Sequence, residues 1–474
     1  MNQTTKNNEV EFKDRVPFKS KLAIGVGGLT QFFGNTFLNN FAFPVYNMTL
    51  GLNPGLLGFA MFIPRLWDAF TDPLMGRISD NTHSKYGRRR PYIVGGTIFA
   101  GITFGLVWMV PQHWSENAMV TWLIVTSLLY YTGVTIYCVP LNSLTYEMTP
   151  DYNERTRVMG FFTFFWKVGE SINHYIFPLG LALAKIALFS SVIVGIRCVG
   201  WGVGLFIFAL IGMIPGLFVK ERYYKKASEQ DKVKIFPSIK DSLKNRAFLI
   251  LIILNIMQSI CAIFASSLDQ YLIVYDMFEG DTQIGMLWKA YLSTGYAVMG
   301  FITIPLLTAF SSRYDKRKAL TLVYILFALS GIVKWFVFTP GSPIKILLDP
   351  LIGAPIWIGI AMILPSMMAD VCDEDELRHH KRREGMFGAM YSWVQKMGFS
   401  LAFLGAGVAL NIVGFDEQLG GNQSPETLLG IRIIFVGGVI LTALLALFIL
   451  KFYPISPERA LETRKELEAR RGKV

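Results

Sequence analysis

Two acidic residues one helical turn apart lie in a stretch that is otherwise typical of a membrane-spanning helix. The segment RLWDAFTDP, residues 65–73, carries Asp68 and Asp72. On a helix this spacing places both carboxylates on one face, about 6 Å apart. A carboxylate that faces lipid at the bilayer centre costs about 2.5–3.5 kcal/mol, so both side chains are expected to face the protein interior. Their mutual repulsion, about 3 kcal/mol at an effective dielectric constant of about 20, is relieved by a bound cation or by one proton.

The residues next to this pair indicate which cation it would hold. Thr71 adds a hydroxyl oxygen, and an oxygen-rich site of this kind suits a hard cation such as Na⁺. Proton exchange at the same pair is the second possibility. Arg65, one turn earlier, offers a third interpretation, in which it neutralises one acid in a permanent ion pair. Because Arg65 cannot neutralise both acids, Asp68 and Asp72 are predicted to be the metal-ligating residues of a cation site.

The composition of the chain is that of a membrane protein. Of its 474 residues 52% are hydrophobic and only 17% are charged, and no large soluble domain fits between the apolar runs. These runs are long enough to cross a hydrocarbon core of about 30 Å as helix. We therefore predict an all-α polytopic membrane protein with twelve transmembrane helices, which begin near residues 22, 55, 91, 118, 157, 195, 247, 285, 318, 346, 385 and 428.

The positive charges lie in every second connection between these spans. The net charge is +11, and connections such as QHWSEN and YDMFEGDTQ contain no Lys or Arg. Basic connections mark the cytoplasmic side of a membrane protein, so both termini are expected on that side. The protein itself is expected to lie in the plasma or inner membrane. The N-terminal segment lacks a signal-peptide pattern. Membrane topology thus accounts for the positive net charge, and no nucleic-acid partner is needed to explain it. The four scattered cysteines do not have the spacing of metal ligands.

A long basic connection near the middle divides the chain into two halves that echo one another. GRISDNTHSKYGRRRP follows the second span, and TAFSSRYDKRKA follows the matching span of the second half. Two six-helix repeats are the layout of the major facilitator superfamily, in which substrate binds between the halves near the midplane. The predicted parts are an N-terminal bundle at 1–219, a cytoplasmic linker at 220–246, a C-terminal bundle at 247–452 and a cytoplasmic tail at 453–474.

Three further spans carry polar residues at helical spacing. Gln31, Asn35 and Asn39 recur every four residues on the first span, and Lys167, Glu170, Ser171 and His174 form a stripe on the fifth. The alternative for the second stripe is a Lys167 to Glu170 pair that only helps helices to pack. On the eleventh span Lys396 lies in an apolar run beside Tyr391 and Trp393. We expect it to pair with Asp68 and Asp72 rather than to reach a headgroup.

Three sequence blocks resemble the glycoside-pentoside-hexuronide:cation symporters, the family of the melibiose permease. They are RLWDAFTDPLMGRISDNTHSKYGRRRPYIV, PLNSLTYEMTPDYNERTRV and MMADVCDEDELRHHKRREGMFGAMYSWVQKMG, in order over most of the chain. The resemblance implies a major facilitator fold and a cation site made of Asp68, Thr71, Asp72 and Thr135. It also implies that Lys396 couples this site to the sugar. The implied cytoplasmic gate consists of Arg65, Asp151, Glu154, Arg155, Asp370, Asp373, Glu374, Arg382 and Arg383.

The chain departs from the sugar-transporting relatives where they bind sugar. The first span has Gln31 and Phe32 where those relatives have an acidic residue. The fourth span lacks their acidic residue in the region of Cys138, and the fifth span lacks their arginine. Lost charged ligands change the chemistry of a pocket. The candidate substrate ligands are therefore Gln31, Asn35, Lys167, Glu170, His174, Tyr391, Trp393 and Lys396.

These observations predict a secondary transporter rather than an enzyme, since no H-E-x-x-H, G-x-S-x-G or phosphate-binding motif stands out. We expect Na⁺- or H⁺-coupled symport of a glycoside, oligosaccharide or sugar acid. The alternative is cation-coupled transport of a lysolipid or other amphiphile on the same fold. No resident cofactor and no nucleic acid are expected, and the protein is predicted to be a monomer surrounded by membrane lipids.

Overall fold

The computed structural model describes residues 15–82, 84–149, 152–185, 191–221, 245–311, 315–379 and 384–471. In this part of the chain every regular element is a helix, as predicted. The chain forms two compact units, Met1–Asp231 and Lys232–Val474. The division falls inside the predicted linker, 220–246, most of which lies outside the described residues. The exact domain ranges remain predictions.

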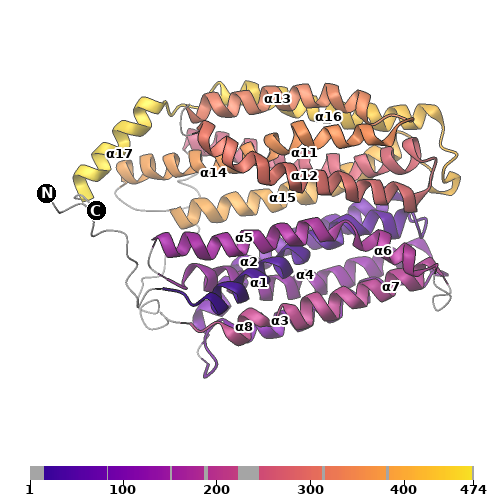
Figure 1. Cartoon of the computed structure of the whole chain (residues 1–474), viewed down its shortest axis with the longest axis horizontal. Helices are drawn as coiled ribbons and strands as arrows, with labels where there is room; N and C mark the ends of the chain where they lie inside the picture. The colour runs from indigo at the N-terminus through magenta and orange to yellow at the C-terminus, as the bar shows by residue number, and fades with distance from the viewer. Residues whose placement is uncertain are drawn as a thin grey trace. The chain divides into compact units, whose positions relative to one another are not determined.

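Figure 1 labels the α-helices of both units. Unit 1 contains α1 (Phe18–Ala42), the π-helix η1 (Phe43–Asn47), α2 (Pro54–Asn81), α3 (Arg90–Val107), α4 (Glu116–Tyr146), α5 (Tyr152–Asn173), α6 (Ile176–Leu183), α7 (Val192–Gly202), the π-helix η2 (Val203–Ile211) and α8 (Ile214–Phe218). Unit 2 contains α11 (Arg246–Tyr271), the π-helix η3 (Leu272–Met277), α12 (Thr282–Ser311), α13 (Lys316–Val337), the 3₁₀-helix η4 (Pro343–Leu348), α14 (Asp349–His379), α15 (Glu384–Ile412), the 3₁₀-helix η5 (Glu417–Leu419), α16 (Pro425–Leu450) and α17 (Pro457–Arg471).

The two units repeat the same helix packing. In unit 1 α1 packs against α5, α2 against α4 and α3 against η2, and α3 also packs closely against α4. In unit 2 α11 packs against α15, α12 against α14 and α13 against α16, and α13 also packs against α14. Each unit thus pairs its first helix with its fifth, its second with its fourth and its third with its sixth, which agrees with the internal repeat in the sequence.

Eight helices in the described part of the chain are long and apolar enough to cross a membrane. Helices α1, α2, α5 and α12 begin near four other predicted spans but do not belong to this set. Helices α1 and α5 carry the two polar stripes noted in the sequence, and α2 carries the acidic pair. Polar side chains in a membrane helix are expected to face the protein rather than lipid.

Local sequence explains how α2 begins and where its hydrogen bonding is interrupted. The side chain of Asn53 accepts hydrogen bonds from the backbone N–H groups of Gly55 and Leu56, and Pro54 occupies the first helical position. Pro64 and Pro73 lie inside the helix. Proline has no N–H to donate to the carbonyl one turn earlier, so both residues weaken the helix on either side of the acidic pair.

A pair of glycines lets α3 approach η2 closely. A Cβ atom added at Gly101 would lie within 2.3 Å of the carbonyl oxygen of Gly204, and one added at Gly204 within 2.4 Å of that of Gly101. Real Cβ atoms do not make such contacts, so any larger residue would push the helices apart. Small residues at helix interfaces are typical of membrane proteins, where close backbone packing drives association.

Three elements differ from the sequence-based expectation. The fifth span is interrupted, because α5 ends at Asn173 and α6 begins at Ile176. The sixth span contains the π-helix η2, and the predicted tail contains the helix α17. Helix α17 is strongly polar and so contains no apolar run that would predict it.

Candidate cation site

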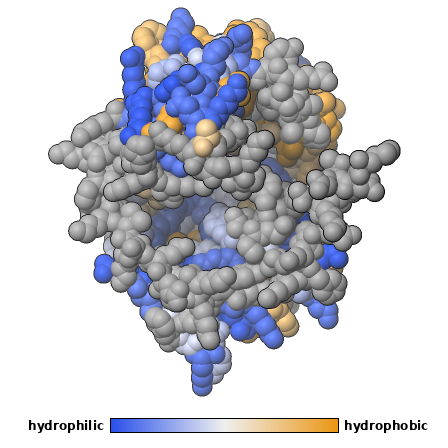
Figure 2. Space-filling view, turned by 90° about the vertical axis from the view of Figure 1, so that its left-hand side faces the viewer, coloured by the Kyte–Doolittle hydropathy of each residue, from blue (hydrophilic) through white to orange (hydrophobic). Residues whose placement is uncertain are grey.

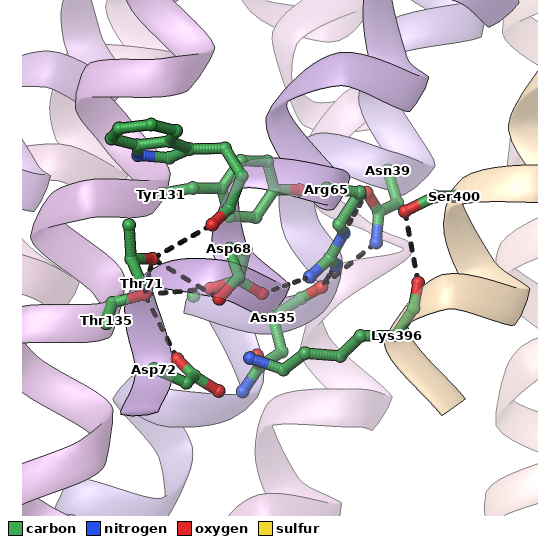
Figure 3. Close-up of polar contacts among 12 residues, drawn as sticks. Asn35, Asn39, Arg65, Asp68, Thr71, Asp72, Tyr131, Thr135, Lys396 and Ser400 are labelled. Carbon is green, nitrogen blue, oxygen red and sulfur yellow. Dashed lines mark hydrogen bonds and ion pairs between the residues drawn. The ribbon is translucent and has the colours of Figure 1, made fainter. Parts of the chain in front are cut away.

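The two acids of α2 face α4, where one hydroxyl group contacts both. Asp68 is 1% exposed and Asp72 is half-buried. The Oγ1 atom of Thr135 on α4 lies 2.8 Å from Oδ1 of Asp68 and 3.2 Å from Oδ1 of Asp72. Figure 3 shows both carboxylates directed toward this hydroxyl. The predicted common face of Asp68 and Asp72 is therefore present, and it faces the interior of unit 1.

Thr71 completes a group of four oxygen-bearing side chains. Its Oγ1 atom lies 3.3 Å from Oγ1 of Thr135. It also lies 3.2 Å from the carbonyl oxygen of Trp67 and 3.3 Å from that of Asp68. The hydroxyl of Thr135 carries a single proton and cannot donate fully to both acids at once. This arrangement suits a small cation, because a cation attracts all of these oxygens together.

Arg65 belongs to this site by position. It is 2% exposed, and its NH1 atom lies 3.5 Å from Oδ2 of Asp68. Its Nε atom donates to Oδ1 of Asn39 at 3.3 Å, and its NH2 atom donates to the carbonyl oxygen of Asn35. The guanidinium carbon lies 4.5 Å from the ring centre of Tyr131. Arg65, which the sequence assigns to the cytoplasmic gate, thus lies between α1, α2 and α4 and shares its donors between Asp68 and α1.

Two residues that hold Arg65 were missed as site residues. The hydroxyl of Tyr131 donates to Oδ1 of Asn39 at 2.9 Å, the same oxygen that accepts from Arg65. Asn39 was visible in the polar face of the first span, but only its contact with α2 gives it a role. Tyr131 lies one turn before Thr135 on α4, and this spacing was the available signal.

The other polar residues of α1 bond mainly along their own helix. The side-chain amide nitrogen of Asn35 donates to the main-chain carbonyl oxygen of Gln31 at 3.0 Å. The side-chain amide nitrogen of Asn39 donates to the main-chain carbonyl oxygen of Asn35, also at 3.0 Å. Gln31 is 7% exposed, and its Oε1 atom is among the buried atoms without a hydrogen-bond partner. An unsatisfied buried oxygen is costly, so Gln31 remains a candidate ligand for a polar group.

On α5 the predicted stripe forms an internal ion pair. The Nζ atom of Lys167 lies 2.6 Å from Oε2 of Glu170, and both side chains are partly exposed. This is the packing pair that the sequence allowed as the alternative to substrate binding. His174 follows the last residue of α5, so it does not continue the helical stripe.

Unit 2 positions the remaining predicted substrate residues on α15. Lys396 and Tyr391 are half-buried, and Trp393 is 41% exposed. The hydroxyl of Ser400 donates to the carbonyl of Lys396 at 3.1 Å, and the amide of Asn255 on α11 donates to the carbonyl of Tyr391 at 2.9 Å. The expected pairing of Lys396 with Asp68 and Asp72 joins different units and stays a prediction.

Three of the predicted gate residues, Glu154, Asp370 and Glu374, form ion pairs inside their own units. Glu154 binds Lys21 at 2.6 Å and accepts from the backbone N–H of Val16 at 3.0 Å. Asp370 on α14 binds Lys316 at 2.8 Å. Asp373 is half-buried on α14, and Glu374 binds Arg378 on the same helix at 2.5 Å. Outside the described residues lie Asp151, Arg382, Arg383 and the side chain of Arg155.

Unit 2 also buries two lysine–aspartate pairs that the sequence analysis missed. Lys289 on α12 binds Asp269 on α11 at 2.5 Å, and Lys334 on α13 binds Asp349 on α14 at 2.6 Å. The hydroxyl of Tyr296 donates to Oδ2 of Asp349 at 2.6 Å. Each lysine stands alone in an apolar span, which was the signal that could have found them. Their partners lie on neighbouring helices and could not be assigned without the fold.

A transition-metal site finds no support in the described residues, where no group of three or more His, Cys, Asp or Glu residues could hold a metal ion. The donors at Asp68, Asp72, Thr71 and Thr135 are all oxygen atoms. Carboxylate and hydroxyl oxygens favour hard cations over soft ones. The arrangement therefore fits Na⁺, Li⁺ or a proton.

Comparison with known proteins identifies the family. Residues 23–457 match the family described as MFS/sugar transport protein. The chain belongs to this family. The resemblance stated from the motifs and the predicted major facilitator fold are confirmed, and the chain is an integral, multi-pass membrane transporter rather than an enzyme.

Individual known proteins match nearly the whole chain. The sodium-dependent lysophosphatidylcholine symporter 1 of Gallus gallus is 25% identical over 97% of this chain and 90% of its own length. The isoprimeverose transporter of Lactiplantibacillus pentosus is 23% identical over 95% of this chain and 91% of its own length. The crystal structure of a D-xylose-proton symporter superposes with a TM-score of 0.62 at 15% identity, covering 92% of this chain and 98% of that one.

Replacing Thr135 tests whether its oxygen belongs to the cation site. Thr135→Val keeps the shape of the side chain but removes the hydroxyl that contacts both acids. Removing a partner of a charged group costs about 1.5–3 kcal/mol, so the cation concentration for half-maximal thermal stabilisation should rise about tenfold or more. Thr135→Ser keeps the hydroxyl and should stay within about threefold of the natural protein. An unchanged half-saturation in Thr135→Val would exclude the hydroxyl as a ligand.

Proposed function

We propose that this chain is a cation-coupled symporter in which Asp68 and Asp72 hold the driving cation. The observation that carries this proposal is the contact of one hydroxyl, on Thr135, with both carboxylates in the interior of unit 1. Two acids that share one hydroxyl proton leave negative charge for a Na⁺ ion or a proton to neutralise. The cation is a transported substrate, and no resident cofactor is part of the mechanism.

Cation binding acts on this site through charge. A cation between the two carboxylates removes their repulsion and draws the Thr135 hydroxyl into coordination through its oxygen lone pairs. The cation then neutralises part of the negative charge of Asp68, which weakens the attraction between Asp68 and Arg65. The other donors of Arg65 already bind Asn39 and the carbonyl of Asn35. Arg65 is thereby the side chain through which occupancy of the cation site reaches α1.

We propose that transport couples this site to a substrate site. The outward-open protein takes the cation first and then the substrate, the two halves rock, and both cargoes leave on the cytoplasmic side. We propose that Lys396 of α15 pairs with these acids and couples cation binding to substrate binding. The protein is proposed to act as a monomer in the plasma or inner membrane, with both termini in the cytoplasm.

The favoured substrate is a glycoside, an oligosaccharide or a sugar acid. The isoprimeverose transporter among the relatives supports the carbohydrate class. The sodium-dependent lysophosphatidylcholine symporter supports the second candidate, a lysolipid or other amphiphile. The internal Lys167 to Glu170 pair leaves fewer charged groups on α5 to bind a sugar directly, which keeps the second candidate open.

A ligand panel distinguishes these substrates. The purified protein is heated in detergent with sugars, sugar acids or lysolipids, in NaCl or in choline chloride at equal ionic strength and at two pH values. A ligand at one hundred times its dissociation constant stabilises the folded protein by about 2.7 kcal/mol. Sodium-dependent or pH-dependent protection by a sugar supports the favoured class, whereas protection by lysolipids alone supports the second. Ligand protection that is independent of both Na⁺ and pH would contradict coupled symport.

A further inference from the structure

A groove between α13 and α16 has no part in the cation or substrate sites. It lies wholly within unit 2, and its volume is about 360 Å³. Its walls come from the first part of α13 and the last part of α16, two helices that pack along one another in Figure 1. Both helices are apolar and long enough to span a membrane.

The groove has a basic end and an apolar wall. Arg317 lies in the first turn of α13 and Lys451 follows the last residue of α16, so both charges lie at the same end. Farther along the groove the wall is formed by Ile325, Leu444 and Phe448, and the last two are 53% and 57% exposed. No acidic residue occurs in the described lining of the groove.

The guanidinium group of Arg317 is held at the mouth of this groove. Its NH2 atom donates to the carbonyl oxygen of Lys451 at 2.9 Å. This bond uses one of the five N–H donors of the side chain. The neighbouring Lys316 is paired with Asp370 at 2.8 Å, and the carboxylate of Asp315 accepts the backbone N–H of Arg317 as the helix cap. The two cations on the groove are thus Arg317 and Lys451.

Both charges lie at the end of unit 2 from which the chain continues into α17, because Lys451 precedes Pro457, the first residue of that helix, by only a few residues. Figure 2 looks onto the side at which α17 lies in Figure 1, and hydrophilic residues near its top adjoin hydrophobic ones. This boundary is where a phospholipid places its headgroup, with its acyl chains extending along the apolar surface. Basic pockets between membrane helices on the cytoplasmic side bind anionic headgroups.

We propose that the α13–α16 groove binds one anionic phospholipid of the cytoplasmic leaflet. Its phosphate lies between Arg317 and Lys451, and an acyl chain lies along Ile325, Leu444 and Phe448. The bound lipid fills the groove and bridges the third and sixth helices of unit 2, and it therefore stabilises the folded protein. The proposal depends on the membrane position and orientation of α13 and α16, and it is independent of the coupling cation and of the transported substrate.

The experiment compares lipids on the full-length protein purified in a neutral detergent. Phosphatidylglycerol and phosphatidylcholine with identical acyl chains are added at equal concentration, and the unfolding midpoint and the lipids retained in native mass spectrometry are recorded. Phosphatidylglycerol should stabilise more and be retained as one tight copy. A charge near an anionic lipid surface changes affinity about fivefold, so Arg317→Gln with Lys451→Gln should weaken retention about 25-fold.

The controls separate lipid binding from a structural role of these residues. Lys451→Gln alone keeps the main-chain carbonyl that binds Arg317, and it should still weaken phosphatidylglycerol about fivefold. Lys345→Gln removes an exposed charge elsewhere in unit 2 and should change nothing. Equal stabilisation by both lipids, the same retention in the double variant, or an equal effect of inorganic phosphate without lipid would overturn the proposal.

Discussion

Asp68→Asn and Asp72→Asn should each abolish cation-driven accumulation of substrate in membrane vesicles. Each change removes one of the two charges that Thr135 brings together, while the amide oxygen can still accept its hydrogen bond. Loss of one partner from a buried charged contact costs about 2–5 kcal/mol, so cation affinity should fall at least about 30-fold. Uptake is measured with an imposed Na⁺ gradient and, separately, with a pH gradient.

Folding and insertion serve as the control for this result. Both variants should reach the membrane in normal amounts. Asp72→Asn should unfold at no lower temperature, because loss of its charge removes the repulsion between the acids. Asp68→Asn also takes a charged partner from buried Arg65, so its unfolding temperature should fall while the protein remains folded and inserted. Glu426→Gln removes an exposed carboxylate at the start of α16 and should transport normally. Accumulation against a gradient by either α2 variant would remove these acids from the mechanism.

Lys334→Met should destabilise the protein by about 3–5 kcal/mol, since removal of one partner leaves a buried charge uncompensated. Lys334 and Asp349 are 7% and 2% exposed, and their closest atoms are 2.6 Å apart. The ammonium group also lies 5.5 Å from the rings of Phe338 and Phe435. The loss is measured from unfolding in detergent.

A double variant shows whether the lost charge pairing is the cause. Lys334→Met combined with Asp349→Asn removes both charges and keeps an oxygen for the hydroxyl of Tyr296. It should regain most of the lost stability, because a pair replaced as a whole is often nearly neutral. Lys345→Met, at an exposed position, should have no effect. A double variant as unstable as the single one would show that Lys334 acts through packing alone.

The helices could be predicted from the sequence because each membrane crossing needs a long apolar run. The exceptions have local causes that an apolar window does not detect. The fifth span is interrupted at His174 and Tyr175, and α17 is too polar to register. The π-helices η1 and η3 follow the first helix of each unit. No residue pattern in the single sequence predicts them.

The candidate site was predictable to the extent that it lies on one helix. The spacing of Asp68 and Asp72 defines a common face, whereas Thr135 could be named only through the resemblance to a family. The contact of Arg65 with Asn39 and Tyr131 joins three helices, and such contacts depend on how the chain packs. The Lys167 to Glu170 pair was predictable because its spacing is helical, but only the structure shows that it forms.

The most direct measurement is the electrical current that a cation concentration jump evokes in liposomes containing the purified protein. The natural protein should give a current with Na⁺ or with H⁺, and that current should saturate as the site fills. The variant that carries both Asp68→Asn and Asp72→Asn should give none at any concentration. A saturable current of unchanged size in that variant would contradict the assignment of the driving cation to these two carboxylates.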